Sequence, residues 1–347
     1  MTRLAVKASG MVTAVGFNSA SSCAAMRAGI RNVRRANLWD PESGKYLAAG
    51  RVPLPQWWVG LGKLADLAAP AILECFQAAR PIPPERIPLL LGVAPADRPF
   101  RLPQLDAQIL PEIEHRLGFR LHVASQVIPR DRVAVVVGLH QAAELIDGRQ
   151  APCVIVAAVD SLLQHDLKNY YLAARRLLTP INSNGFSLGE AGSAMLVAAT
   201  SDTPGGSLEI LGMALTQEKA TIESEDPLKA EALTEAISEA LRKSSLTIQQ
   251  VHYRIADLNG EHYKFKEMAL ALGRFPRKPT GKTFTVWHPI EYFGDVGAAI
   301  GPILLGWARH AGLKGYGNGT TTLCTLSNDN GARAALVVAY RQGETAR

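Results

Sequence analysis

The sequence of 347 residues has few cysteines and no long apolar run. Its four cysteines, Cys23, Cys75, Cys153 and Cys324, lie far apart, and no two form a CxxC pair. This spacing argues against a zinc knuckle and a disulfide framework, and it predicts buried thiols in a reducing compartment. No stretch reaches the roughly 18 apolar residues of a membrane span, and the N-terminus has no apolar run of signal-peptide length. We therefore expect a cytoplasmic protein without a membrane partner.

Several cofactor motifs are absent as well. The sequence has no G-x-x-x-x-G-K-[ST] loop, no G-x-G-x-x-G after a strand and no H-E-x-x-H. These absences argue against nucleotide, nicotinamide and zinc chemistry, so we expect no cofactor and no bound metal. Basic residues are scattered, so we expect no nucleic-acid partner. The formal net charge of +6 has two open interpretations, a mildly basic solvated surface or attraction to an acidic partner such as a carrier protein.

What is present is an average globular composition with alternating strands and helices. Apolar runs predict strands at residues 4–6, 89–91, 153–159, 194–198, 208–212, 251–258, 320–326 and 334–340. Helical spacing predicts helices at residues 19–28, 64–79, 105–117, 133–146, 227–243 and 295–310. Glycine, proline and polar residues predict an irregular surface segment at residues 38–58. A polar turn at residues 201–206 predicts two similar α/β halves, residues 1–203 and 204–347.

Five segments match one ordered set of motifs. The opening SGMVTAVG at residues 9–16 is followed by a predicted helix, and the strand at residues 153–159 ends in Asp160-Ser161 before NGFSLGEA at residues 184–191. Near the other end stand GDVGAA at residues 294–299 and SNDNG at residues 327–331. In this order the segments resemble the β-ketoacyl-acyl-carrier-protein synthases of the thiolase-like superfamily, with their DGF-x-x-GE[AG], GH-x-x-GAAG and GFGG-x-N motifs.

The resemblance implies a fold and partners. The fold would be α/β, a thiolase fold of two similar βαβαβ halves in a five-layer α-β-α-β-α arrangement. The protein would form a homodimer along strands beside the helix that carries the nucleophile, or a heterodimer with another thiolase-fold protein. An acyl carrier protein is a further expected partner.

The nucleophile that the resemblance implies is missing from the sequence. Condensation needs a thiolate, whose pKa enzymes lower at a helix N-terminus beside basic groups. Counting back from Leu145 and Ile146 places the cysteine of the family near Arg132, and anchoring on Gly138 places it near Val135. Neither register contains a thiol, so we expect Arg132 to line the degenerate pocket.

The two histidines of the family are replaced too. Asn259 stands before Gly260 where the first is expected, and Asp295 stands at the second. A carboxyl at this second position can donate a hydrogen bond at neutral pH only if its pKa is strongly raised. His262 comes three residues late, so it is either an exposed polar residue or displaced chemistry, and His288 can approach only if its loop folds back.

Other polar residues have two interpretations each. Asn328 and Asn330 either donate from their side chains where the family has an oxyanion hole, or form Asx turns. Asp131 either caps the helix predicted at residues 133–146 or belongs to an anion-binding helix start with its arginine neighbours. For Glu190 the resemblance implies a buried structural carboxylate.

Three functional hypotheses follow. The first is a β-ketoacyl synthase-like protein without condensing activity that acts as a non-catalytic partner or binds acyl groups or carrier protein. The second is an active acyltransferase or 3-oxoacyl-acyl-carrier-protein synthase with a non-standard site, which uses His262 with Glu261 or water. The third is an accessory protein of a secretion or biosynthetic gene cluster. Whether the protein is an enzyme stays open at this point.

Overall fold

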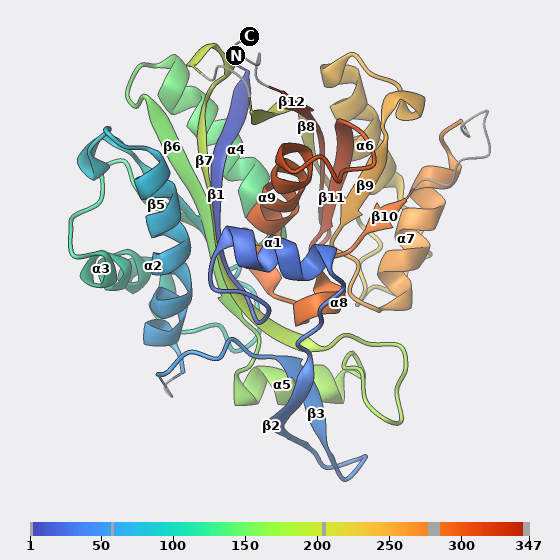
Figure 1. Ribbon diagram of the computed structural model, residues 1–347. Coiled ribbons are helices and arrows are strands. Elements are labelled where there is room, and N and C mark those ends of the chain that lie inside the picture. Colours follow the sequence, from blue (N-terminus) through green and yellow to red (C-terminus); the bar gives the residue numbers. More distant parts are fainter. Residues whose placement is uncertain (1–2, 57–58, 203–205, 277–284, 343–347) are drawn as a thin grey trace.

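Two facing sets of five strands enclose a pair of central helices (Figure 1). The computed structural model describes residues 3–56, 59–202, 206–276 and 285–342. The central helices are α4 (Ala134–Asp147) and α9 (Ile300–Leu313). Both are strongly apolar, and their side chains fill one core together with residues from both sets of strands. The start of each central helix therefore lies in the interior, where the candidate site forms.

The first set of strands comes from the N-terminal part of the chain. Its strands are β1 (Leu4–Val12), β4 (Leu89–Gly92), β5 (Gln126–Ile128), β6 (Cys153–Ser161) and β7 (Leu188–Ala199). They are hydrogen-bonded in the order β5-β4-β6-β7-β1, and β7 is antiparallel to both of its neighbours. The outer face is covered by α2 (Leu61–Ala78), against which α3 (Leu105–Leu117) packs.

The second set repeats this arrangement. Its strands are β8 (Ser207–Gln217), β9 (Tyr253–Ala256), β10 (Val286–Trp287), β11 (Thr321–Ser327) and β12 (Ala332–Arg341). The order is β10-β9-β11-β12-β8, and β12 is antiparallel to both neighbours, as β7 is in the first set. Its outer helices are α6 (Glu231–Ser244) and α7 (His262–Gly273).

The predicted five-layer thiolase fold is confirmed. Counted along its own half, each set has the same strand order, with helices outside, between and outside again (Figure 1). The two sets are joined where β1 pairs with β8, at Ala5 and Glu209. The division predicted between residues 203 and 204 falls on residues that the structure does not describe, so it stays a prediction. None of the described helices is both long and apolar enough to cross a membrane.

Close backbone contacts fix how the helices sit on the sheets. A Cβ atom at Gly192 of β7 would lie 2.0 Å from the carbonyl oxygen of Leu67, so α2 rests directly on the strand. A Cβ atom at Gly301 would lie 2.7 Å from Cγ1 of Val135 and 3.0 Å from the carbonyl oxygen of Arg132. Because only glycine permits this approach, α9 begins against the start of α4.

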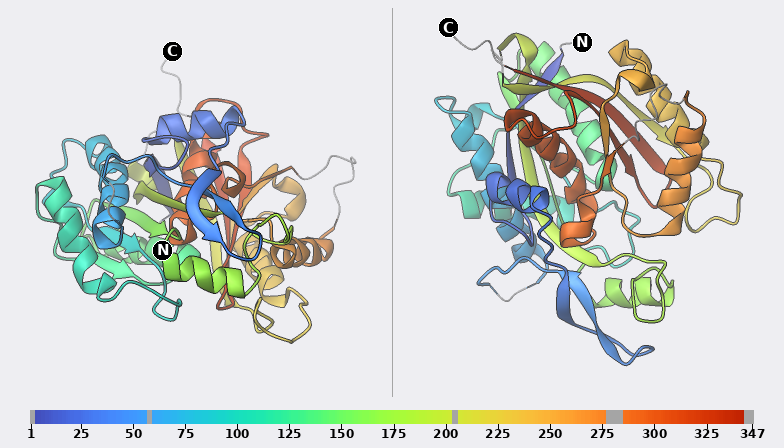
Figure 2. Two further views of the ribbon diagram at one scale, coloured as in Figure 1. Left: turned by 90° about the horizontal axis from the view of Figure 1, so that it is seen from below. Right: turned by 45° about the vertical axis from the view of Figure 1, so that its right-hand side comes forward.

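The segment expected to be irregular is instead partly a hairpin. Strands β2 (Arg34–Asp40) and β3 (Lys45–Gly50) pair, and β3 continues onto β7 at Ala49 and Leu188. The rings of Trp39 and Tyr46 meet edge to face with centroids 5.1 Å apart across the hairpin. Figure 2 shows the hairpin projecting from the body of the molecule beside α5 (His165–Ala173), a helix that the sequence did not predict. The prediction failed because β2 is mostly polar and exposed, and the apolar residues 46–49 of β3 form only a short run beside Gly44 and Gly50.

The remaining elements are short or shifted at their ends. Helix α1 (Ser19–Arg27) agrees with its prediction, whereas α6 begins at Glu231 rather than at residue 227, after Ala230 with φ of 56°. The other single-turn elements are η1 (Pro84–Arg86), η2 (Asp131–Val133), η3 (Thr200–Asp202), η4 (Ile248–Gln250), α8 (Ile290–Phe293) and η5 (Gly297–Ala299).

Candidate functional site

The site begins at the turn η2, immediately before α4. Asp131 has a positive φ of 52°, a backbone conformation that few non-glycine residues adopt, and such residues gather at functional sites. The next residue, Arg132, is buried with 5% of its surface exposed. Its Nη2 donates a hydrogen bond to Oδ2 of Asp295 at 2.8 Å, and its Nε lies 3.7 Å from Oδ2 of Asp257.

Three of the predicted site residues therefore meet. Asn259 donates through Nδ2 to Oδ2 of Asp295 at 2.9 Å and to Oε2 of Glu261 at 3.0 Å. The other oxygen of Asp295 accepts from the backbone N–H of Gly297 at 3.1 Å. Arg132 thus comes from the first half of the chain, and Asn259 and Asp295 come from the second.

Asp295 accepts hydrogen bonds and does not donate them. Burial, the largest single influence, would raise the pKa of this carboxyl group, but the charge and hydrogen bond of Arg132, together with neighbouring groups, hold the pKa below its usual range. Lys264 and Asn259 act in the same direction. The residue at this position is therefore an ionised acceptor, and the raised pKa that donation requires is not found.

Arg176 extends the polar contacts beyond the predicted residues. It makes two hydrogen bonds to Glu261, at 2.8 and 3.0 Å, and two to Asp329, at 2.8 and 3.1 Å. Its guanidinium carbon also lies 5.2 Å from the ring centroid of Tyr171. A continuous set of contacts results, here named the buried ionic layer: the buried residues Arg132, Asp295, Asn259, Glu261 and Arg176, with Asp329, whose side chain is 33% exposed, at its rim.

Sequence patterns did not reveal the second half of this layer. Arg176 lies in a loop between α5 and β7 and belongs to no motif. Asp329 lies inside the SNDNG segment, in which the sequence predicted roles only for the two asparagines. Below the layer, Lys264 donates to Oδ2 of Asp257 at 2.7 Å and to the carbonyl oxygen of Ser327 at 2.9 Å. The only sequence signal for Glu261 was its place beside His262.

The start of α4 is capped from the other half of the chain. Oδ1 of Asn328 accepts from the backbone N–H of Val133 at 3.3 Å, and Nδ2 donates to the carbonyl oxygen of Arg130 at 2.8 Å. Asp131 makes no such cap, so the capping interpretation of Asp131 is wrong. Oδ1 of Asn330 accepts a hydrogen bond from the backbone N–H of Ala332 at 3.3 Å, which agrees with the Asx-turn interpretation.

The histidines lie outside this set of contacts. His262 is the first residue of α7, and its side chain is exposed. Its backbone N–H donates to Oδ1 of Asn184 at 2.8 Å. Nδ1 of His288 lies 3.7 Å from a carboxylate oxygen of Glu291. Of the two interpretations of His262, the exposed polar residue agrees with its position.

All four cysteines are buried, as predicted, and carry no disulfide. Burial raises the pKa of Cys23 and Cys324 to about 12 each and that of Cys153 to about 11. Burial also raises the pKa of Cys75 well above its ordinary value. Because the thiolate is the reactive form, these groups are poor nucleophiles at neutral pH.

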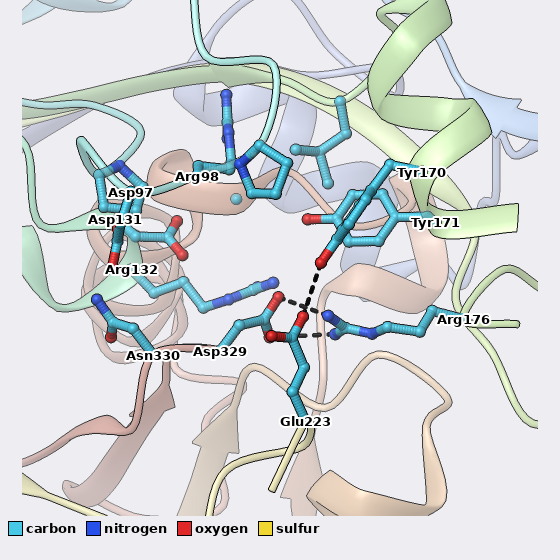
Figure 3. Close-up of a pocket in the computed structure, with 14 residues that line it drawn as sticks. Asp97, Arg98, Asp131, Arg132, Tyr170, Tyr171, Arg176, Glu223, Asp329 and Asn330 are labelled. Atoms are coloured by element: carbon cyan, nitrogen blue, oxygen red, sulfur yellow. Dashed lines mark hydrogen bonds and ion pairs between the residues drawn. The ribbon is translucent and has the colours of Figure 1, made fainter. Parts of the chain in front are cut away.

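A small polar cavity of about 160 Å³ lies beside the buried ionic layer (Figure 3). In Figure 3 the side chain of Arg132 reaches into it from one side, while Arg176 and Asp329 face each other across its floor. Among the described residues, no group of histidine, cysteine and carboxylate side chains is arranged to hold a metal ion. The lining residues are Pro95, Asp97, Arg98, Pro99, Asp131, Arg132, Leu162, Tyr170, Tyr171, Arg176, Glu223, Gly297, Asp329 and Asn330.

Glu190 lies apart from the cavity with its charge paired. Its Oε1 is 3.0 Å from Nζ of Lys63 and accepts from the backbone N–H of Val52, and Ser161 donates to its Oε2. This agrees with the structural carboxylate that the resemblance implies. The preceding residues 185–189 fit the G-x-S-x-G pattern of hydrolases, but they lead into strand β7, whereas that motif joins a strand to a helix.

The strand order and the paired central helices define a thiolase-like fold. No protein-family profile and no curated protein sequence matches this chain. Solved structures do match. The ishigamide ketosynthase/chain length factor is 16% identical, aligns over 98% of this chain and 99% of that chain, and has a TM-score of 0.72.

Two further structures are complexes. One is a type II polyketide synthase acyl-carrier protein with its ketosynthase bound to the hexaketide, at TM-score 0.78, 16% identity and coverage of 98% and 99%. The other is a ketosynthase with its chain length factor from Xenorhabdus doucetiae, at TM-score 0.78, 13% identity and coverage of 98% of both chains. At identities this low, the structural similarity establishes the fold of the present chain and nothing further.

Proposed function

We propose that this protein is a ketosynthase-fold subunit without condensing activity, which acts as the non-catalytic partner of a second thiolase-fold protein. The observation that carries this proposal is the contact of Arg132 with Asp295 and Asn259, at 2.8 Å from Arg132 to Asp295 and 2.9 Å from Asn259 to Asp295. The sequence resemblance places the cysteine near Arg132 or near Val135, and the two histidines at Asn259 and Asp295. An ionised acid paired with arginine supplies neither a thiolate nor an imidazole donor.

Purified protein should therefore fail to condense acyl and malonyl carrier-protein thioesters. Radiolabelled thioesters would be incubated with the protein alone, with an active ketosynthase run in parallel as the positive control. Turnover comparable with the control would contradict the proposal. The His262→Ala variant tests the acyltransferase alternative in the same assay, because that alternative requires thioester cleavage that disappears with the imidazole.

The partner would bind at the free edge of the first set of strands. Strand β5 pairs with β4 on one side, and no described strand pairs with its other side. An edge strand presents unpaired backbone groups to which a second strand can add. Ketosynthase complexes with a chain length factor or an acyl-carrier protein among the similar structures support a thiolase-fold partner and a carrier-protein contact.

A charge on this edge should weaken the dimer. Gln126 is an exposed residue of β5, and lysine there is the device that natural edge strands use against pairing. We expect Gln126→Lys to raise the dimer dissociation constant about tenfold, which is roughly 1.4 kcal/mol. Sedimentation equilibrium of the protein alone and with a candidate ketosynthase measures it. Gln249→Lys, at an exposed site in η4, is the matched control, and equal dimerisation of both variants would place the interface elsewhere.

A further inference from the structure

The residues that line the cavity of Figure 3 include three with buried, unpaired hydrogen-bonding atoms, of both donor and acceptor kinds. Among the described residues, Nη1 of Arg132 and Nε of Arg98 are buried donors without a hydrogen-bond partner, and Oδ1 of Asp131 is a buried acceptor without one. Arg132 is 5% exposed and Asp131 is 9% exposed. Each such atom costs about 1–3 kcal/mol as long as it has no partner, so a ligand that supplied one would be stabilised at this site.

The charges around the cavity are mixed rather than cationic. Arg98 donates to Asp160 at 2.6 Å, Arg132 to Asp295 and Arg176 to Glu261 and Asp329, so each lining arginine has a carboxylate partner. Asp131 makes no comparable contact through Oδ1. A simple anion would meet this carboxylate, and a simple cation would meet the guanidinium N–H groups.

A molecule that carries both a negative and a positive group could pair with the arginines and with Asp131 at the same time. We propose that the cavity binds a small zwitterion of α-amino-acid size, with its carboxylate toward Arg98 and Arg132 and its ammonium group toward Asp131. The N-terminal end of α4 adds to the attraction for the carboxylate. Tyr170 and Tyr171 can face the ammonium group, because aromatic rings attract cations.

The size of the cavity supports the same class of ligand. Its volume of about 160 Å³ is below the roughly 300 Å³ at which pockets for drug-sized ligands begin, so a long acyl chain does not fit within it. Pro95, Pro99 and Leu162 provide an apolar part of the wall for a short side chain. This site goes beyond the proposed partner role and needs neither a thioester nor a second protein.

Calorimetric titration of the purified full-length protein at pH 8, above the raised pKa of Asp131, with each of the twenty common amino acids tests the proposal. We expect at least one to bind, and its decarboxylated amine and its N-acetyl derivative to bind at least tenfold more weakly, because each lacks one of the two charges. Absence of binding at 10 mM for all twenty, as expected for a cavity that holds only water, overturns the proposal. Equal binding of either derivative overturns it as well.

The Asp131→Asn variant locates the site. Asparagine has nearly the same size and tolerates the positive φ at this position, while it removes the carboxylate. We expect an affinity loss of at least tenfold, with Asp166→Asn on the exposed surface of α5 as the matched control that binds normally. Unchanged affinity in Asp131→Asn overturns the proposal. If that variant does not fold, the comparison of ligand derivatives on the unmodified protein decides, and neither result depends on condensing activity.

Discussion

Ion pairs occur in two contrasting settings in this molecule, the buried ionic layer and the exposed surface of α6. The side chains of Arg132 and Asp295 are 6% and 0% exposed, whereas those of Arg242 and Glu239 are 71% and 34% exposed. Burying two charges removes their hydration, which their attraction only partly returns, and breaking such a pair leaves one charge stranded. Exposed pairs lose little hydration and contribute little. An arginine–carboxylate pair therefore holds the buried side chains in one arrangement, whereas an exposed pair changes the free energy of unfolding very little.

The largest effect should come from removing one partner of the buried pair. Arg132→Met leaves Asp295 as an unpaired buried charge, so we expect a loss of about 3–5 kcal/mol in the free energy of unfolding. Urea denaturation followed by circular dichroism measures it. The double variant Arg132→Met with Asp295→Leu removes both charges and should recover most of the loss. A single variant within about 1 kcal/mol of the parent would show that the layer is not energetically coupled.

The same pair gives a pH signature. In the folded protein the pKa of Asp295 is held below its usual value. The ionised carboxylate therefore adds to the free energy of unfolding above the unfolded pKa of about 4, and this stabilisation is lost as the pH falls through the folded pKa. Without Arg132 the pKa of this carboxyl group should rise. The difference in stability between the parent and Arg132→Met should therefore grow from pH 4 to pH 7, and a constant difference would contradict this assignment.

The carboxyl group of Asp131, beside the buried ionic layer, should change the stability of the protein with pH in the opposite direction. Burial raises the pKa of Asp131 from 3.8 to about 7, against the attraction of Arg132, so the folded protein holds a proton there that the unfolded chain has released. This contribution is greatest below pH 4 and is lost as the pH rises through about 7.

Asp131→Asn should remove that dependence. We expect the variant to be more stable than the parent at pH 8 by on the order of 4 kcal/mol, since the pKa of Asp131 rises from 3.8 to about 7 and one pKa unit corresponds to about 1.4 kcal/mol, and to approach the parent near pH 4. Thermal unfolding at both pH values measures the difference. A variant less stable at pH 8 would mean that the carboxylate is paired in solution.

The smallest effect should come from the exposed pair. Glu239→Gln on α6 removes a carboxylate that contacts Arg242 and Lys243 on a solvated surface. We expect no measurable change in the melting temperature at physiological salt, because water and ions screen such pairs. A loss comparable with that of Arg132→Met would overturn the contrast between the two settings.

The sequence predicted the framework well where local patterns were strong. The apolar run at residues 153–159 became β6, and the helical spacing at residues 133–146 became α4. The order of motifs predicted the fold and brought attention to Arg132, Asn259 and Asp295, which the structure places in contact. The hairpin of β2 and β3 escaped prediction because β2 is mostly polar, and because the contact of Trp39 with Tyr46 and the pairing of β3 with β7 join residues that are not neighbours in sequence.

The sequence by itself determined the alternation of strands and helices, the repeat of the two halves and the absence of a CxxC pair, because each of these is a property of neighbouring residues. Only the tertiary structure decided which charges meet. Arg132 and Asp295 are 163 positions apart, and Arg176 and Asp329 are 153 apart. No local periodicity encodes such pairs. They exist because the fold packs segments that are far apart in sequence against one another, and a charge that becomes buried there needs a partner.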